Sequence, residues 1–313
     1  MQIFLETLTA LWPLYFFMLV GALLRRAGVI TDALAPPLNG LIFKAFLPIS
    51  LFLNVYDAEL NFSESVGAIV FVLCSYGLLF ALLMWIVPRL VRERPVAATV
   101  VQGLYRSNFV LLGLAYAVQL FGKEKAGEAS ILIAVIVPLF NVLAVIDFAL
   151  LGGGGKPKPR DILLRILKNP LILAALLALV LRLAGFRLPG FVHDPLNTLA
   201  GVATPFAMVV VGSSLTLRGF RKNGRCVAIV TAVRLLAIPA VFLPLVVLLG
   251  FRGVTLIAFL TAFAGPCAVS SSAMAYQMGG DGELAGQLVA ATSVASLLTM
   301  YLFIVLLRTL GFC

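Results

Sequence analysis

The side chains best suited to bind a ligand lie inside two long apolar stretches of the chain. Residues 102–109 read QGLYRSNF and residues 263–272 read FAGPCAVSSS. Pro266 removes a backbone hydrogen-bond donor, Gly265 makes unwinding of a helix less costly, and Asn108 can bond to backbone groups that an unwound turn leaves free. We predict that each stretch is a membrane helix interrupted near its middle.

An interrupted helix presents free N–H groups at the start of its second half, and their positive potential suits anions. Interruptions in corresponding helices of two halves indicate a transporter binding site, whereas a single interruption is equally consistent with an ordinary kink. The residues that we expect at the site are Arg106, Ser107, Asn108, Gly265, Pro266, Cys267 and Ser270, with Ser50 as a weaker candidate.

Arg106 would lie deep in the bilayer, where a charged side chain costs at least ~2.5 kcal/mol and therefore faces protein or a water-filled cavity. Its planar guanidinium can hold a carboxylate through two parallel hydrogen bonds, which favours an anionic ligand. The alternative is a structural ion pair with Asp147, the one acidic residue predicted to lie well inside a helix. Arg234 is a second candidate partner for Asp147, because intramembrane charges usually pair with one another.

The composition requires lipid as the main solvent of the chain. Hydrophobic residues make up 62% and charged residues 12% of the 313 residues, and the mean hydropathy is +1.11. Soluble domains are usually about half apolar and about a quarter charged. The four cysteines are scattered and His193 is the single histidine, so a Cys/His zinc site lacks its usual ligands and no cofactor is expected.

Ten apolar segments are long enough to cross a bilayer as helices. They are apolar all round rather than alternating, which favours helices over the strands of a barrel. The expected spans are residues 8–24, 34–55, 66–87, 97–120, 129–151, 167–184, 196–217, 227–249, 254–278 and 285–307. The sequence therefore predicts an all-α polytopic membrane protein.

The basic residues predict the orientation of these spans. With the N-terminus outside, 14 of the 23 Lys and Arg fall in inside loops, 6 in outside loops and 3 within helices, as the positive-inside rule requires. The net charge of +10 is thus an orientation signal rather than a nucleic-acid footprint. Glu6 precedes the first apolar segment and Arg25 and Arg26 follow it, the reverse of a cleavable signal. We expect a multi-pass protein of the bacterial inner membrane with both termini in the periplasm.

The two halves of the chain share a sequence pattern. Residues 24–28 (LRRAG) resemble residues 181–185 (LRLAG), and residues 37–41 (PLNGL) resemble residues 195–199 (PLNTL), at spacings of 157 and 158 residues. Because each half has five spans, the second half enters the membrane from the opposite side, and helices four and nine are the interrupted pair at corresponding positions. The expected domains are a first five-helix repeat, a cytoplasmic Gly/Pro linker and a second, inverted repeat, at residues 1–151, 152–161 and 162–313.

With these motifs the sequence resembles the auxin efflux carrier family of bacteria and plants. The resemblance covers essentially the whole chain. It rests on residues 41–48 (LIFKAFLP), residues 106–109 (RSNF) with Gly113, and Gly265-Pro266 followed by Ser270, Met274-Ala275 and residues 279–281 (GGD). It implies ten helices in a fold similar to that of bile-acid/sodium symporters, in which the broken helices four and nine cross at unwound segments beside the substrate.

The resemblance also implies a cargo and two contacts. Members of the family carry organic anions, such as auxin in plants and malonate or malate in bacteria. Asn108 matches the crossover asparagine that contacts substrate in plant carriers, and Ser50 lies close to a helix-two serine implicated there. The chain departs from plant members in its short linker and in a second crossover that reads Gly-Pro-Cys rather than asparagine-rich.

The favoured function is secondary transport of a small mono- or dicarboxylate by alternating access. H⁺ or Na⁺ is a candidate coupling ion, a homodimer is a candidate assembly, and nucleic acid is not expected as a partner. An intramembrane enzyme would need convergent nucleophiles, acid/base groups or metal ligands, which these motifs lack. A small-ligand sensor is disfavoured because the chain has no soluble output domain.

A single cysteine placed at Lys158 tests the orientation. We expect it to react with a membrane-impermeant maleimide only after spheroplasts are opened, because the linker is predicted to face the cytoplasm. A cysteine at Arg252, predicted to be outside, is the matched control and should react in intact spheroplasts. Reaction of the Lys158 position in intact spheroplasts would overturn the ten-helix arrangement.

Overall fold

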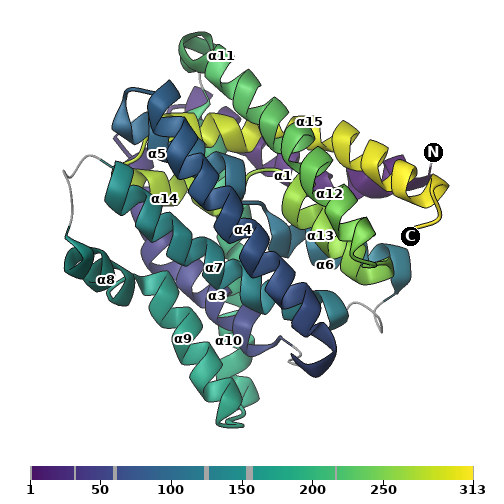
Figure 1. Ribbon diagram of the computed structural model, residues 1–313. Helices are drawn as coiled ribbons and strands as arrows, with labels where there is room; N and C mark the ends of the chain where they lie inside the picture. Colours follow the sequence, from purple (N-terminus) through teal and green to yellow (C-terminus); the bar gives the residue numbers. More distant parts are fainter. Residues whose placement is uncertain are drawn as a thin grey trace.

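The computed structural model describes residues 2–31, 33–58, 62–122, 127–152, 158–215 and 217–312, and this part of the chain is helical with no strand (Figure 1). The two η elements are π-helical turns inserted into longer helices. In chain order the elements are α1 (Gln2–Arg26), α2 (Ala35–Leu41), η1 (Ile42–Phe46), α3 (Leu47–Tyr56), α4 (Phe62–Leu90), α5 (Arg94–Tyr105), α6 (Phe109–Phe121), α7 (Gly127–Leu151), α8 (Pro159–Leu167), α9 (Pro170–Leu183), α10 (Gly190–Ser214), α11 (Leu217–Ala232), η2 (Val233–Ala237), α12 (Ile238–Leu248), α13 (Gly253–Ala264), α14 (Ser270–Met278) and α15 (Gly282–Thr309).

Long apolar helices dominate the described residues. Six helical stretches are long and apolar enough to cross a membrane, and α8 with α9 makes a seventh if the bent pair is one span. Large apolar side chains such as Leu78, Trp85 and Leu177 are more than half exposed, as expected where the surrounding solvent is lipid. The all-helical, multi-pass class predicted from the sequence is confirmed.

The sixth expected span is corrected at its start. Instead of one helix over residues 167–184, α8 and α9 meet at a bend of 63°. Asn169 begins α9, because its side-chain oxygen accepts from the backbone N–H groups of Leu171 and Ile172, and Pro170 follows in the first turn. Since α8 starts at Pro159, the last three residues of the expected linker are helical.

Each π-helical turn ends two residues before a proline. η1 precedes Pro48 and η2 precedes Pro239. A proline has no N–H and its ring clashes with the carbonyl four residues earlier, so the preceding turn is widened. The turn widened at η2 is the one that carries Arg234.

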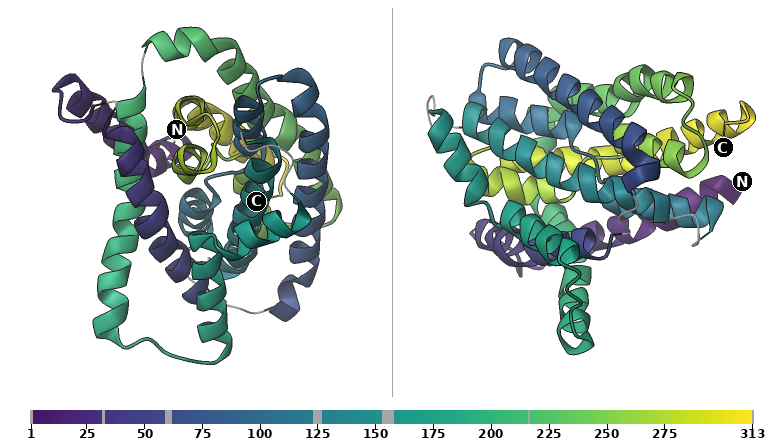
Figure 2. Two further views of the ribbon diagram at one scale, coloured as in Figure 1. Left: turned by 90° about the vertical axis from the view of Figure 1, so that its left-hand side faces the viewer. Right: turned by 60° about the horizontal axis from the view of Figure 1, so that its bottom comes forward.

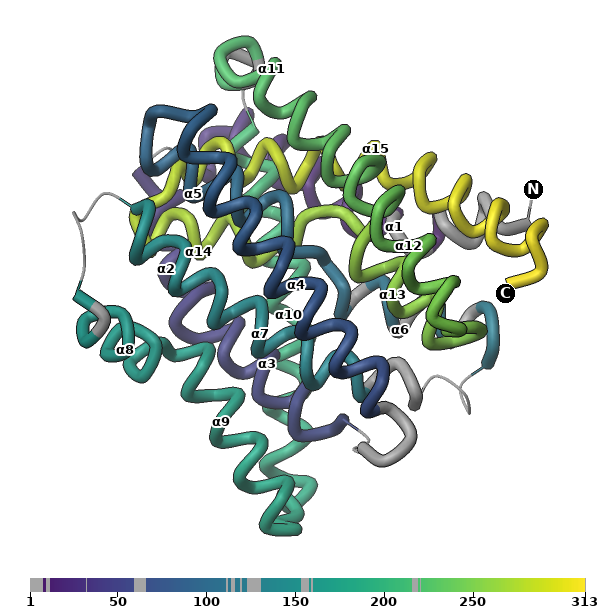
Figure 3. Tube along the Cα trace, in the orientation of Figure 1, coloured from purple at the N-terminus to yellow at the C-terminus, as the bar shows by residue number. Residues whose placement is uncertain are grey.

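The helices form two groups. In the support group, α1 packs along α10, and α3 packs against both α9 and α10. The crossing group contains α4 to α7 and α11 to α15. The loop end of α9 and α10 projects from the molecule in the right view of Figure 2. The chain ends lie at one end of the molecule and α8 lies at the opposite end (Figure 3).

Two glycines let α1 and α10 touch through their backbones. A Cβ added at Gly21 would overlap the carbonyl oxygen of Val209, and one added at Gly212 would overlap the carbonyl oxygen of Met18. Lipid tails are as apolar as the helix faces, so helices in a bilayer associate through this kind of close packing.

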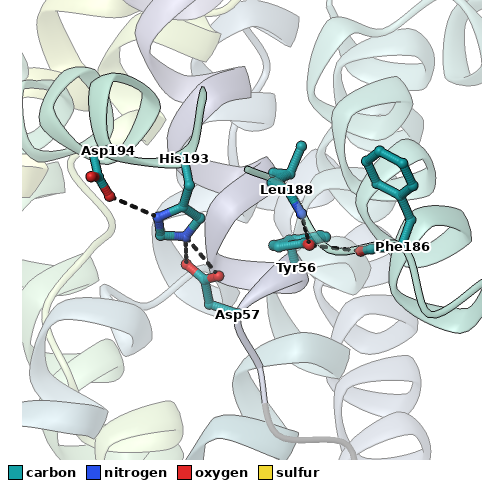
Figure 4. Close-up of polar contacts among 6 residues, drawn as sticks. All are labelled: Tyr56, Asp57, Phe186, Leu188, His193 and Asp194. Carbon is teal, nitrogen blue, oxygen red and sulfur yellow. Dashed lines mark hydrogen bonds and ion pairs between the residues drawn. The ribbon is translucent and has the colours of Figure 1, made fainter. Parts of the chain in front are cut away.

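A polar cluster joins the end of α3 to the turn before α10 (Figure 4). The Tyr56 hydroxyl donates to the carbonyl of Phe186 at 2.7 Å and accepts from the N–H of Leu188 at 2.8 Å. The Nε2 atom of His193 lies 3.0 Å from the Asp57 carboxylate. The support group is thus held by polar contacts at one end and by glycine packing along α1 and α10.

Gly212→Ala should lower the free energy of unfolding by about 1–3 kcal/mol, because the added methyl forces two backbones apart. Gly201→Ala, on the same helix, is the matched control, since no atom lies within 4 Å of the added Cβ. Thermal unfolding in detergent measures both variants. An unchanged melting temperature for Gly212→Ala would show that the close contact is not needed for stability.

Candidate functional site

Both interruptions predicted from the sequence are present. The backbone N–H of Asn108 donates to the carbonyl of Pro266 at 2.8 Å, and that of Ala268 donates to the carbonyl of Arg106 at 3.1 Å. The two unwound segments run antiparallel, and each satisfies backbone groups of the other, which lipid cannot do. These segments, residues 106–108 and 265–269, are called the crossing below.

Arg234 binds the ends of both helices that lead into the crossing. Its side chain is 0% exposed. Nη1 donates to the carbonyls of Leu104 and Tyr105 at 2.7 and 3.1 Å, at the end of α5. Nε and Nη2 donate to the carbonyls of Gly265 and Ala262, both at 3.1 Å, at the end of α13. Helix C-termini carry partial negative charge, so one guanidinium satisfies and neutralises two of them.

Cys267 is fixed in the crossing through its backbone and its sulfur. Its N–H donates to the hydroxyl of Thr292 at 3.0 Å, and its thiol donates to the carbonyl of Gly103 at 3.1 Å. Gly265 has no room for a side chain, because an added Cβ would overlap the carbonyl oxygen of Thr261. The second unwound segment is therefore tied to α5 and to α15.

A cavity of about 120 Å³ opens beside the crossing. Four of the expected site residues line it, namely Ser50, Arg106, Asn108 and Ser270. The other expected residues, Ser107, Gly265, Pro266 and Cys267, are not among its lining and form the crossing itself. Because Asn108 precedes α6 and Ser270 begins α14, the cavity faces the N-terminal ends of both helices.

Arg106 reaches the cavity as a positioned charge. It is 4% exposed. Nη2 donates to Asn141 Oδ1 and to Ser270 Oγ, both at 3.0 Å, and Nη1 donates to the carbonyl of Phe140 at 3.2 Å. Asn141 is oriented in turn by a bond from its amide nitrogen to the carbonyl of Val137 at 2.9 Å. This arrangement fixes one end of the guanidinium beside a polar cavity that a carboxylate can enter.

The ion pairs considered for Asp147 are not formed in the described part of the chain. Asp147 is 0% exposed, and neither of its oxygens has a hydrogen-bond partner among the described residues. Arg106 and Arg234 direct their donors to amide, hydroxyl and carbonyl oxygens instead. For Arg234 the physical reason is that carbonyls left free at the ends of α5 and α13 take up its donors, and for Arg106 it is that Asn141 and Ser270 supply side-chain oxygens.

Sequence reasoning missed several polar residues of the site. Asn54, Asn141 and Thr204 line the cavity. Their signal was a lone polar side chain inside an apolar span, which is costly in lipid unless it has a partner. Thr292 belongs to a run of small polar residues on α15 that helix packing alone would explain.

A polar cavity at the crossing of two interrupted helices, within a polytopic helical protein, is the architecture of a membrane transporter. A family model described as membrane transport protein matches residues 7–304. The chain belongs to this family, which is the auxin efflux carrier family that the motifs resemble.

Two relatives in this family are themselves described as uncharacterized transporters. One, from Methanothermobacter thermautotrophicus, is 24% identical over 310 residues, which cover 98% of this chain and 100% of the relative. The other, from Methanocaldococcus jannaschii, is 24% identical over 295 residues, which cover 91% of this chain and 94% of the relative. The similarity therefore extends through both halves of the chain.

Arg234→Met should lower the free energy of unfolding by at least about 3 kcal/mol, because each buried carbonyl that loses its donor costs about 1–3 kcal/mol. The loss comes from the four backbone carbonyls left without donors. Arg252→Met is the matched control, since Arg252 also donates to backbone carbonyls but is exposed, and it should change stability by less than about 0.5 kcal/mol. Equal thermal unfolding of the two variants in detergent would contradict the role given to Arg234.

Proposed function

We propose that this protein is a secondary transporter that carries a small organic anion, a mono- or dicarboxylate, across the membrane by alternating access. The observation that carries the proposal is the cavity, which brings Arg106 together with the N-terminal ends of α6 and α14. One guanidinium and two helix N-termini present positive potential to a single small volume. That combination suits a carboxylate.

The polar lining supports recognition beyond charge. Asn54, Asn108 and Asn141 bring amide groups to the cavity, and Ser50 and Ser270 bring hydroxyls. The Nδ2 atom of Asn108 has no hydrogen-bond partner among the described residues, although it is buried. A buried donor of this kind costs free energy unless a ligand or water accepts its hydrogen bond.

The position of the cavity supports alternating access. Leu51 of α3 and Ala203 of α10 line it from the support group, and Arg106 and Ser270 line it from the crossing group. A site between two groups of helices changes its access when one group moves against the other. We propose that the crossing group carries the anion past α3 and α10.

We further propose ten membrane spans arranged as two inverted repeats, residues 1–151 and 162–313, joined by residues 152–161. Ten is reached when α1, the bent pair α8–α9 and the interrupted pairs α5–α6 and α13–α14 are added to the six continuous spans. The antiparallel crossing supports inversion, since matching segments of inverted repeats run in opposite directions. In Figure 1 the two termini lie at the end of the molecule opposite α8, which begins within the linker. This placement supports termini outside the membrane and a basic linker inside.

Arg106→Gln should weaken binding of malonate by at least about tenfold, because a charge-assisted hydrogen bond contributes roughly 1.5–3 kcal/mol. Malonamide has a similar shape without the charge, so the wild-type protein should prefer malonate and the variant should lose most of that preference. Calorimetry on purified protein measures both ligands. Succinate and acetate extend the comparison to other di- and monocarboxylates.

Asn108→Ala should also weaken carboxylate binding while leaving expression unchanged, because Asn108 offers a free donor to the ligand. For Arg106→Gln, the control for the loss of one positive charge is Arg252→Gln, which removes an exposed arginine at the other end of α13 from the crossing. An amine that binds as tightly as its matched carboxylate, or full binding by Arg106→Gln, would end the anion hypothesis.

A further inference from the structure

Asp147 is the acidic residue that the described chain buries at membrane depth without a hydrogen-bond partner. It lies within the membrane-length stretch Ile131–Leu151, its exposed fraction is 0%, and both carboxylate oxygens are unpartnered. An ionised carboxylate in such a place costs several kcal/mol, so the group takes up a proton instead. Intramembrane carboxyl groups of this kind serve as proton relays in pumps and transporters.

Contacts on either side of Asp147 fix its position along α7 relative to the neighbouring helices of the crossing group; positions at the same height along these helices are called one level. At one level, Arg106 of α5 binds Asn141 of α7 and Ser270 of α14. At the other level, Phe148 of α7 and Thr99 of α5 both lie against Gly280, just beyond α14. Asp147 therefore lies about 9 Å along α7 from Asn141, at 1.5 Å per residue, between the anion cavity and the far end of α5.

Other unpartnered polar atoms lie on the same segments of α5 and α14. Gln102 donates weakly to the sulfur of Met274 at 3.8 Å, and its side-chain oxygen has no partner. The hydroxyls of Tyr105 and Ser271 are also buried without partners in the described chain. These groups both donate and accept, as a proton path through bound water requires, and those on α5 lie at levels between Thr99 and Arg106.

A second opening lies beside the same part of α7. A cleft of about 440 Å³, named the linker-side cleft, is lined by Val145, Phe148 and Ala149 of α7 and by polar residues of α8. With 3.6 residues per helical turn, these three residues lie on the opposite face of α7 from Asp147. The carboxyl group is not among the lining and is closed off from this cleft in the conformation described.

Few charged groups face Asp147 from the elements packed against α7. Tyr105 of α5 interacts with it electrostatically, and Arg106 is turned toward Asn141 and Ser270. Arg94, at the start of α5, donates to the carbonyl of Leu150, three residues beyond Asp147 on α7, at 2.9 Å. Tyr56 of α3 and Tyr76 of α4 donate to the carbonyls of Phe186 and Ala262, and Tyr116 of α6 interacts with Tyr15. Three charged residues of α8 surround the linker-side cleft, namely Asp161, Arg165 and Lys168.

We propose that Asp147 carries a proton through the transport cycle. One carboxylate oxygen binds a proton from water that reaches it when the crossing group moves, giving a neutral acid; release of that proton to water on the other side of the membrane regenerates the carboxylate, and the same two steps run in reverse. The inference rests on the proposed transport of an anion, because a proton that moves with the anion cancels one negative charge. It adds to that function a coupling ion and the residue that holds it.

Carbodiimide labelling of the wild-type protein tests the first part without any substrate. Dicyclohexylcarbodiimide adds to protonated carboxyl groups in apolar surroundings, and mass spectrometry locates the adduct. We expect Asp147 to be labelled, more at mildly acidic than at alkaline pH, and Asp194, an exposed carboxylate, to remain unlabelled. No label on Asp147 under conditions that leave the protein folded would overturn the proposal.

Asp147→Asn, which mimics the neutral acid, tests coupling in proteoliposomes. Malonate exchange measures anion movement, and an entrapped pH dye measures the proton movement that malonate drives. We expect the variant to keep exchange and to lose the proton movement, whereas Asp194→Asn should keep both. Full proton movement in Asp147→Asn would refute the role of Asp147.

The two proposals fail in different ways. If wild-type protein moves no malonate or other carboxylate, anion transport is wrong. If it moves malonate with no proton, or carries no label at Asp147, anion transport survives and the proton site does not. Should Asp147→Asn not fold, wild-type labelling decides: modification of Asp147 that abolishes malonate-driven proton movement supports the proposal, and modification that leaves it intact overturns it.

Discussion

The requirement that two helices end inside a bilayer governs the structure around the crossing. α5 and α13 both stop there, and the last carbonyls of each have no partner within their own helix. Lipid supplies no donor, and each unsatisfied group would cost several kcal/mol. Four hydrogen bonds from Arg234 and two between the unwound segments meet this requirement. With these hydrogen bonds made, the backbone of the two segments can stay unwound beside the cavity.

The same geometry gives the crossing two electrostatic sides. The C-terminal ends of α5 and α13 meet Arg234, and the N-terminal ends of α6 and α14 face the cavity that Arg106 lines. Arg234 donates four hydrogen bonds to backbone carbonyls, so its charge is balanced by the helix ends. The Nε atom of Arg106 is buried without a partner in the described chain, and the residue lines the cavity. The two intramembrane arginines thus have different surroundings: Arg234 holds helix ends, and Arg106 borders the cavity in which an anion is proposed to bind.

The sequence predicted the interruptions because their signals are local. Gly265-Pro266 breaks a helix by its own chemistry, and a charged residue followed by Ser107 and Asn108 is unfavourable inside an apolar span. The partners of Arg234 could not be predicted in this way, because the carbonyls that it binds on α5 lie about 130 residues away in the chain and carbonyls are present in every sequence. The bend before Pro170 had a local signal in Asn169-Pro170, but the surrounding hydrophobicity outweighed it.

Hydrogen bonding is distributed unevenly around the cavity, and this determines where motion is least costly. Within the crossing group, Arg234, Thr292 and Tyr76 bind backbone groups at or beside the crossing from three different helices. In the described residues, no hydrogen bond joins the crossing to α3 or α10, although both helices line the cavity with apolar and polar side chains. The bond from Tyr15 of α1 to the carbonyl of Ser293 on α15, at 2.8 Å, links the two groups without using a cavity residue. Surfaces that share no hydrogen bond can move past each other without breaking one, whereas a hydrogen-bonded crossing in lipid cannot come apart without a large penalty. The proposed movement of the crossing group past α3 and α10 would therefore keep the hydrogen bonds of the crossing intact.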